Sequence, residues 1–358
     1  MFKLHLARNL RSFGFLAVLI AVLTLAALAG LGVRWVDLDA RPFHHDEATQ
    51  AMRLADAVRD GGWRYDPVDH HGPLLPLATW ASVVPLRGAA AAGWSETDLR
   101  AVTVGFGLLA ALLVALALRP WGGVAMAGGA AAAAWSTGLM YFSRFHIPEM
   151  ALVAASAAGI ATAWWWARGP AWPRTLALGA ALGAALAAKE TAVLLVLASG
   201  LAALPLLRGV DRRILARDGG VALAAATAVW ALLITGLGTH PGALIDTIRA
   251  IPIYLDRAGG GEHPHPWWFY LHLIARQEWP LALLALIGAV LTWRTPAARW
   301  LTLTTVLTLA LYSALSYKTP WCVATVLMLC AVLAGLGLGA LATWRWWLAA
   351  PAALLLIP

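Results

Sequence analysis

The sequence predicts an all-α polytopic membrane protein, and three features of its composition point to this fold class. Of the 358 residues, 61% are hydrophobic and 12% are charged, whereas a soluble domain is about half apolar and a quarter charged. The apolar residues gather in runs that approach the roughly 20 residues a helix needs to cross a bilayer. The 33 glycines favour close packing of membrane helices, and many of the 20 tryptophans lie near the ends of these runs.

The apolar runs predict about eleven transmembrane helices. They lie near residues 13–34, 99–118, 122–141, 149–167, 175–188, 191–207, 218–238, 279–293, 300–316, 320–341 and 344–358. The first run is expected to stay as a span, because no signal-peptide cleavage site precedes the next polar stretch. The runs 175–188 and 191–207 are short and flank Lys189-Glu190, so one long broken pair is an alternative.

The apolar segment 74–92 is expected to form a half-helix or an interfacial helix rather than a span. It contains Pro76 and Pro85 and directly follows Pro73. If it does not cross, the N-terminus is cytoplasmic and the arginines of every second connection share its side, as the positive-inside rule requires. These are Arg119, Arg168, Arg174, Arg208, Arg212, Arg213, Arg217, Arg294, Arg299 and Arg345. The net charge of +8 and the pI of about 10.1 then reflect topology and not binding to nucleic acid.

The whole chain, 1–358, is expected to form a single transmembrane domain in the cell membrane, because no large soluble segment and no repeat interrupts the apolar runs. The large connections 35–98 and 239–278 both fall on the extracytoplasmic side by the same alternation, and together they are expected to form the site. The chain ends inside an apolar run, so a C-terminal truncation is one interpretation. Cys322 and Cys330 lack the spacing of a zinc ribbon or a disulfide framework.

The first outer connection contains His44-His45-Asp46-Glu47, an unusual cluster in a chain so poor in acids. Neighbouring carboxylates perturb each other's ionisation and the imidazoles offer charge partners, an arrangement that suits a general base. The alternative is the start of an interfacial helix, with Asp46 as its cap and Glu47 in its first turn.

The same connection continues with Asp69-His70-His71-Gly72-Pro73. Imidazole and carboxylate groups suit divalent cations, so His70 and Glu47 are candidate ligands of a divalent metal ion. No HExxH spacing accompanies them, and no cofactor is firmly implied. His71 is equally suited to contact a phosphate.

Further charges interrupt the later outer connections. Arg144 and Glu149 lie between two apolar runs, where a charge is costly and usually has a role, although an interfacial arginine is the alternative. Lys189-Glu190 stands between two short runs, and an internal ion pair is the simplest interpretation. Lys318 lies at the outer end of a later run.

Together and in this order, these pieces resemble the GT-C glycosyltransferase superfamily, in particular the protein mannosyltransferases and the lipid A aminoarabinose transferases. The chain is most similar to a prokaryotic family of flippase-activity-associated glycosyltransferases. The matching stretches extend over nearly the whole chain: His45-Asp46-Glu47-Ala48, Tyr65-Asp66-Pro67-Val68, His71-Gly72-Pro73-Leu74, Ser143-Arg144-Phe145, Lys189-Glu190-Thr191 and Lys318-Thr319-Pro320-Trp321.

The resemblance implies a GT-C fold and the transfer of a sugar from a polyprenyl-phosphate donor to a hydroxyl of an acceptor glycan, lipid or protein. It assigns the catalytic carboxylate to Asp46, with Glu47 beside it, and a second acid to Glu149, where aspartate is more usual. His71 takes the place of a lysine that contacts the lipid phosphate. The further cations expected at this phosphate are His45, His70, Arg144, Lys189 and Lys318.

Two other functions compete with glycosyl transfer. A transporter or a flippase component for lipid-linked sugars would usually place its charges and broken helices at the bilayer midplane, often in repeated halves. A zinc hydrolase would need a recognisable set of ligands. The sequence instead gathers its charges at one predicted surface and shows neither a repeat nor such a set, which favours the transferase.

Overall fold

A computed structural model describes residues 2–66, 71–259 and 263–356, with side chains from Gly14 onward. Within these residues the chain is helical and has no strand. In chain order the helices are α1 (Phe2–Val33), α2 (His45–Arg59), α3 (Leu74–Arg87), η1 (Ala91–Gly93), α4 (Glu96–Leu118), η2 (Arg119–Trp121), α5 (Gly123–Trp135), α6 (Thr137–Ser143), α7 (Glu149–Ala167), α8 (Trp172–Ala188), α9 (Ala192–Leu207), α10 (Arg212–Ile234), α11 (Ala243–Ala258), α12 (Phe269–Gln277), α13 (Trp279–Thr292), α14 (Pro296–Ala314), η3 (Pro320–Val323), α15 (Ala324–Trp344) and α16 (Trp346–Leu354).

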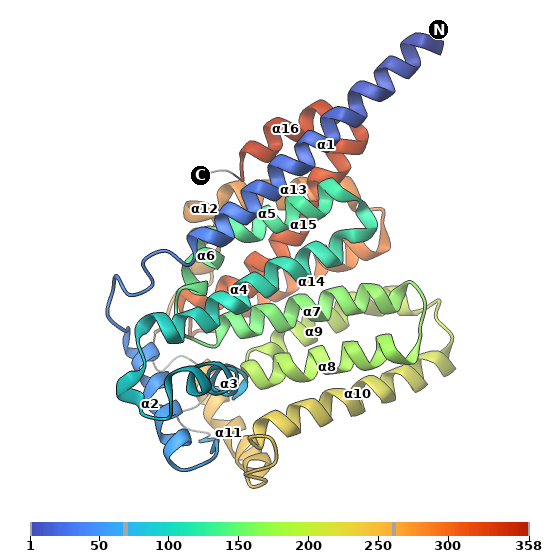
Figure 1. The fold of residues 1–358 in the computed structure, drawn as a ribbon. Coiled ribbons are helices and arrows are strands. Elements are labelled where there is room, and N and C mark those ends of the chain that lie inside the picture. The colour runs from blue at the N-terminus through green and yellow to red at the C-terminus, as the bar shows by residue number, and fades with distance from the viewer. Residues whose placement is uncertain (1, 67–70, 260–262, 357–358) are drawn as a thin grey trace.

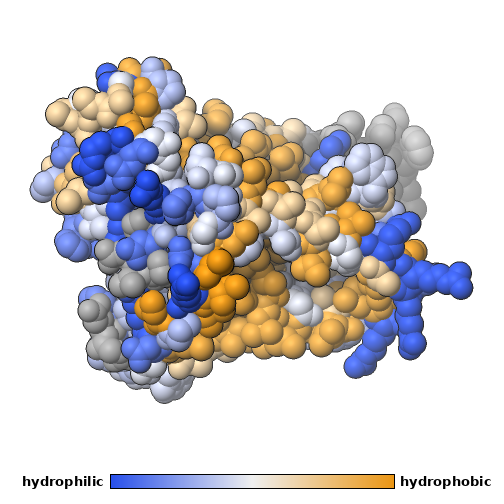
Figure 2. Space-filling model, turned by 90° about the horizontal axis from the view of Figure 1, so that it is seen from below, coloured by the Kyte–Doolittle hydropathy of each residue, from blue (hydrophilic) through white to orange (hydrophobic). Residues whose placement is uncertain are grey.

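The long helices run side by side, and α2, α3 and α11 lie across one end of the bundle (Figure 1). Figure 2 shows the surface that results: a broad hydrophobic band separates two hydrophilic ends. The connections alternate between these ends, so those predicted to be outer lie beside α2, α3 and α11, and those that carry the predicted inner arginines lie at the other end. We refer to the end that holds α2, α3 and α11 as the outer end.

Each of the predicted spans overlaps a helix, but their number stays a prediction. Among the described residues, five helices are long and apolar enough to cross a membrane, or six if α12 and α13, which meet at a bend of 102°, form one span. Three further apolar helices, α3, α5 and α9, are shorter. For example, α5 has 13 residues, which corresponds to about 20 Å at the helical rise. Segment 74–92 contains α3, whose 14 residues are also too few to span alone.

Helix α15 forms the centre of the bundle. In the span that contains it, 94% of the most apolar stretch is buried, compared with 17% in the peripheral α10. It packs against α13 and α5, and small residues permit the close approach. A Cβ atom at Gly288 of α13 would collide with the backbone carbonyl of Leu333, and one at Gly335 would lie 2.7 Å from the carbonyl oxygen of Ala125. These glycines set the spacing of the central helices.

A helix break at Ser136 separates α5 from α6 near the outer end. Arg34, which is buried, donates to the carbonyl oxygens of Ala133 and Ala134 in the last turn of α5, at 2.7 and 3.0 Å. Glu278, at the bend between α12 and α13, accepts from the backbone N–H of Gly138 and from the hydroxyl of Ser136, at 2.6 and 2.9 Å. A cation at a helix C-terminus and an anion at a helix N-terminus both oppose the helix dipole. The break therefore leaves few backbone groups unpaired in an apolar environment.

We expect Gly288→Ala to destabilise the protein by about 1–3 kcal/mol, because the added methyl overpacks the contact between α13 and α15. Gly200→Ala in α9 is the matched control, since no atom lies within 4 Å of a Cβ at that position. Thermal unfolding in detergent would compare the two variants. Equal melting temperatures for both would show that the glycine contact does not limit the packing of α15.

Candidate functional site

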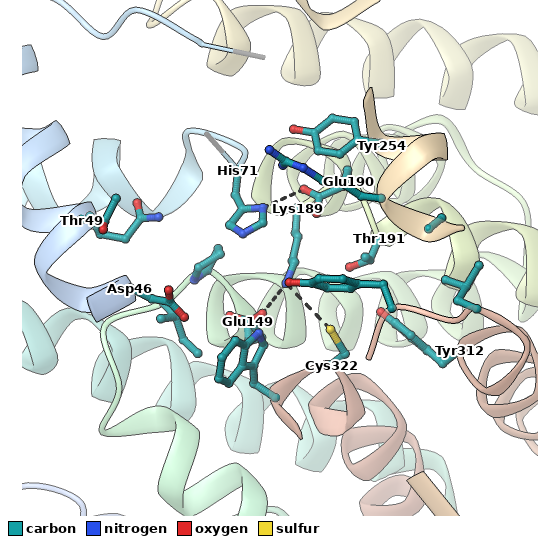
Figure 3. Close-up of a pocket in the computed structure, with 18 of the residues that line it drawn as sticks. Asp46, Thr49, His71, Glu149, Lys189, Glu190, Thr191, Tyr254, Tyr312 and Cys322 are labelled. Atoms are coloured by element: carbon teal, nitrogen blue, oxygen red, sulfur yellow. Dashed lines mark hydrogen bonds and ion pairs between the residues drawn. The ribbon is translucent and has the colours of Figure 1, made fainter. Parts of the chain in front are cut away.

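A cavity of about 280 Å³ opens at the outer end of the bundle. Its lining comes from segments far apart in the sequence (Figure 3): α2, the start of α7, the junction of α8 and α9, α11, α12, the end of α14 and η3. Both large outer connections contribute to its wall, through residues such as Asp46 and Tyr254. Contacts between connections close the wall, including a hydrogen bond of 2.9 Å between the hydroxyls of Tyr65 and Tyr254.

Asp46 lies in the first turn of α2 and lines the cavity. The helix starts there because His44 is its N-cap: the imidazole of His44 accepts from the backbone N–H of Asp46 at 3.3 Å, and Glu47 accepts from the N–H of His44 at 3.0 Å. The predicted helix start is therefore present, with His44 and not Asp46 as the cap. A carboxylate in the first turn faces the positive end of the helix dipole. The side chain of Asp46 is 39% exposed, and His45 lines the cavity beside it.

Glu47 points away from this cavity into the protein. Its side chain is fully buried, and Arg100 of α4 donates to its two carboxylate oxygens, with both distances 2.8 Å. The backbone N–H of His146 donates to the same carboxylate, also at 2.8 Å. Burial alone would raise the pKa of Glu47, but the hydrogen bonds from Arg100 and the two backbone N–H groups lower it. This geometry does not support the expected catalytic or metal-binding role of Glu47, because both oxygens already have donors.

The guanidinium of Arg100 also organises the chain that precedes α2. It donates to the carbonyl oxygens of Leu38, Arg41 and Pro42, at 2.5, 2.9 and 3.1 Å. The pair of Glu47 and Arg100 therefore attaches the first outer connection to α4. It determines where α2 begins and, with it, where Asp46 lies.

Arg144 and Lys318, two expected phosphate contacts, do not line the cavity. Arg144 donates to the carbonyl oxygen of Asp37 at 3.1 Å. Lys318 is buried and donates to the carbonyl oxygens of Leu315 and of His265, the latter at 3.0 Å. Both side chains are engaged with backbone carbonyls of the outer connections, so the geometry supports a structural role for them and not contact with a phosphate.

The cavity floor holds an ion pair between Glu149 and Lys189. Glu149 is the first residue of α7, and Lys189 is the residue that ends α8. Their side chains are 3% and 5% exposed. Lys189 also lies 4.0 Å from the sulfur of Cys322. The internal pair expected between Lys189 and Glu190 is thus replaced by a pair across two helices.

Glu190 pairs instead with His71 across the cavity wall, with 3.0 Å between Oε2 and Nδ1. Burial would raise the pKa of Glu190, but His71 and then Lys189 lower it to about 2. His71 is held there by Gly72, where a Cβ atom would collide with the backbone carbonyl of Ala187. This close contact explains why a glycine follows the histidine.

The expected metal site has little support among the described residues. No group of three His, Cys, Asp or Glu side chains lies close enough to hold a metal ion in that part of the chain. Glu47 forms an ion pair with Arg100, and His70 lies outside the residues that the structure describes.

Several lining residues were not singled out from the sequence. Thr49, Gln50 and Arg53 follow Asp46 at helical spacing on one face of α2, so the 3.6-residue period could have identified them. Tyr312, Cys322 and Arg257 reach the cavity only through the packing of α14, η3 and α11, and no local pattern marks them.

No family model matches the chain, and no curated protein matches it either. Solved structures do. ArnT from Cupriavidus metallidurans bound to undecaprenyl phosphate matches with a TM-score of 0.69 and 19% identity over 94% of this chain. An oligosaccharyltransferase from Archaeoglobus fulgidus matches with a TM-score of 0.65 and 15% identity over 93% of this chain.

The protein O-mannosyltransferase complex of S. cerevisiae bound to its sugar donor matches with a TM-score of 0.50 and 19% identity, over 64% of this chain and 34% of that one. This chain spans 62% of the ArnT chain and 50% of the oligosaccharyltransferase. The shared feature is the overall arrangement of helices. The protein is therefore a polytopic, all-helical membrane protein with the fold of the GT-C glycosyltransferase superfamily.

Proposed function

We propose that the protein is an integral-membrane glycosyltransferase that moves a sugar from a polyprenyl-phosphate donor to an acceptor hydroxyl at the extracytoplasmic face. The observation that carries the proposal is the outer-end cavity, in which an accessible carboxylate, Asp46, shares one space with cationic groups such as Lys189. The fold adds support, because ArnT, with the same helix arrangement, was solved with undecaprenyl phosphate. The acceptor is a hydroxyl of a glycan, a lipid or a protein.

In this proposal Asp46 is the general base. It takes the proton of the acceptor hydroxyl while that oxygen bonds to the anomeric carbon of the donor. The bond between the anomeric carbon and the phosphate oxygen breaks in the same step, through an oxocarbenium-like transition state. The bonding electrons leave with the lipid phosphate. Asp46 suits the base role better than Glu47 or Glu149, because their carboxylates are buried and paired with Arg100 and Lys189.

The departing phosphate gains a negative charge that nearby cations stabilise. Of the phosphate contacts expected from the sequence, His45 and His71 line the cavity and are suited to this role. Lys189 also lines it, but lies at its floor in the pair with Glu149. Arg53 of α2 and Arg257 of α11 line it as well, and they extend the cationic part of its wall. Arg144 and Lys318 are left out of this role because they contact backbone carbonyls.

A transporter or flippase component is less well supported. Charges that bind a transported substrate usually lie near the bilayer midplane. Here the charged residues and the histidines of the cavity belong to α2, α11, the outer end of α7, the junction of α8 and α9, and the segment before α3 that holds His71. They surround a space at one end of the bundle, where a lipid donor from the outer leaflet and an acceptor from outside can meet.

We expect Asp46→Asn to lower sugar transfer by about 10²- to 10⁴-fold, because it removes general-base assistance and keeps the shape of the side chain. The assay follows labelled sugar from a panel of polyprenyl-phosphate donors in proteoliposomes. Donor binding and the melting temperature should stay close to those of the unmodified protein. Near-normal transfer by Asp46→Asn would exclude this residue as the base.

Glu47→Gln should act through stability instead. Removing the charge of one partner from a buried pair leaves Arg100 uncompensated and costs about 3–5 kcal/mol. We expect a clearly lower melting temperature in detergent, and transfer that falls only in proportion to the folded fraction. Asp46→Asn is the matched control, because its carboxylate is partly exposed. Loss of transfer by fully folded Glu47→Gln protein would restore Glu47 as a catalytic candidate.

The orientation in the membrane is tested by cysteine labelling in intact cells. The proposal places the N-terminus in the cytoplasm and the outer end of the bundle outside the cell membrane. With Cys322→Ala and Cys330→Ala as background, Arg59→Cys in α2 should react with a membrane-impermeant maleimide. Arg294→Cys, between α13 and α14, should react only after permeabilisation. The reverse pattern would place the cavity on the cytoplasmic side and contradict the proposed donor face.

A further inference from the structure

The side chains that line the cavity are more exposed at its mouth than at its floor. At the mouth, the side chains of Asp46 and His71 are 39% and 36% exposed. At the floor, those of Glu149 and Lys189 are 3% and 5% exposed. A ligand that fills the cavity therefore meets Asp46 near solvent and meets the buried ion pair at its far end.

The buried ion pair has hydrogen-bonding capacity that the described residues do not use. Lys189 donates to Oε1 of Glu149, whereas Oε2 of the same carboxylate is buried and accepts no hydrogen bond from any described residue. The ammonium of Lys189 has three N–H donors, and among the described residues only Glu149 and the more distant Cys322 accept from them. The ion pair at the floor thus contains one unpaired carboxylate oxygen and one available N–H.

An unpaired buried acceptor of this kind is costly, by about 1–3 kcal/mol or more for a charged group. A ligand that supplies a donor to Oε2 recovers this free energy, and a ligand that lacks the donor does not. The charges of Glu149 and Lys189 determine which kind of hydrogen-bond donor on the ligand fits Oε2. Lys189 neutralises Glu149 and repels an ammonium group, so a neutral hydroxyl fits better. A second, adjacent hydroxyl can accept from Lys189.

We propose that Glu149 and Lys189 form a subsite that recognises hydroxyl groups of the transferred sugar. A pair of neighbouring hydroxyls on the ring binds there, with one donating to Glu149 and the other accepting from Lys189. The inference rests on the proposed function and gives Glu149 a binding role in it. The acceptor hydroxyl meets Asp46 at the mouth, so the sugar of the donor is the part that reaches the floor.

An acceptor, Glu149, beside a donor, Lys189, favours a ligand with two neighbouring hydroxyl groups, as a sugar ring has. Tyr270 and Tyr312 line the cavity near the same ion pair, and aromatic rings offer apolar faces to the C–H groups of a sugar ring. A polyprenyl phosphate without a sugar contacts the cations of the wall and leaves Oε2 of Glu149 unpaired.

The test compares two kinds of ligand on the unmodified full chain in nanodiscs. Undecaprenyl phosphate alone measures the lipid-phosphate site. Undecaprenyl phosphate esters of glucose, galactose, mannose and arabinose measure the added effect of a sugar. We expect at least one ester to bind about 10- to 100-fold more tightly than the sugar-free lipid, as hydrogen bonds to a charged group permit. Monodeoxy analogues of that sugar should lose most of this gain at one or two ring positions.

Glu149→Gln should abolish most of the gain from the sugar and leave the affinity for undecaprenyl phosphate unchanged. Glu190→Gln is the matched control, since it makes the same chemical change at a carboxylate nearer the mouth and should affect both ligands alike. If the loss of charge beside Lys189 prevents folding, Glu149→Gln combined with Lys189→Met removes both charges together. The deoxy-sugar series needs no variant at all.

The outcomes separate the two proposals. If undecaprenyl phosphate binds but no ester gains affinity, or Glu149→Gln weakens both ligands equally, or every deoxy analogue binds like its parent, the subsite is wrong and the lipid-phosphate site stands. If neither the lipid phosphate nor any ester binds to the unmodified protein, the proposed function fails, and the subsite fails with it.

Discussion

The fully buried contact between Glu47 and Arg100 is the interaction on which the outer end of the structure depends. Two charges are removed from water there, which is tolerated only because each is paired and hydrogen-bonded further. Arg100 uses its remaining N–H groups on three carbonyl oxygens of the first outer connection. Glu47 also accepts hydrogen bonds from the backbone N–H groups of His44 and His146. One ion pair thereby joins α2, α4 and the segment before α7.

The same physical constraint explains the other buried charges. In a low-dielectric environment a charge needs a counter-charge or an oriented dipole. Arg34 and Glu278 meet this need at the break between α5 and α6, where they face opposite ends of two helix dipoles. Lys189 and Glu149 meet it at the cavity floor. Glu149 leaves one oxygen, and Arg34 leaves its Nε, without a hydrogen-bond partner among the described residues. Of these two residues only Glu149 lines the cavity, and the proposed sugar subsite rests on this placement.

The cavity also shows how adjacent residues acquire different roles. Asp46 and Glu47 are neighbours in the first turn of α2, yet their side chains point about 100° apart around the helix, one toward the cavity and one toward Arg100. Lys189 and Glu190 separate in the same way, toward Glu149 and toward His71. The two adjacent pairs of charged residues thus contribute to three ion pairs, with Arg100, Glu149 and His71 as partners. Asp46 stays partly exposed at the cavity.

The sequence by itself determined that the chain is helical and membrane-embedded, where its apolar runs lie, and that its unusual charges gather at one end. Hydrophobic length and the alternation of connections carry this information, because each depends on local composition. It also pointed to Asp46, His45, His71, Glu149 and Lys189, which line the cavity. Only the tertiary structure decided that Glu47, Arg144 and Lys318 are engaged elsewhere and that Tyr312 and Cys322 reach the floor. Ion pairing between distant helices and the direction of each side chain depend on packing across the whole bundle, and no local pattern encodes them.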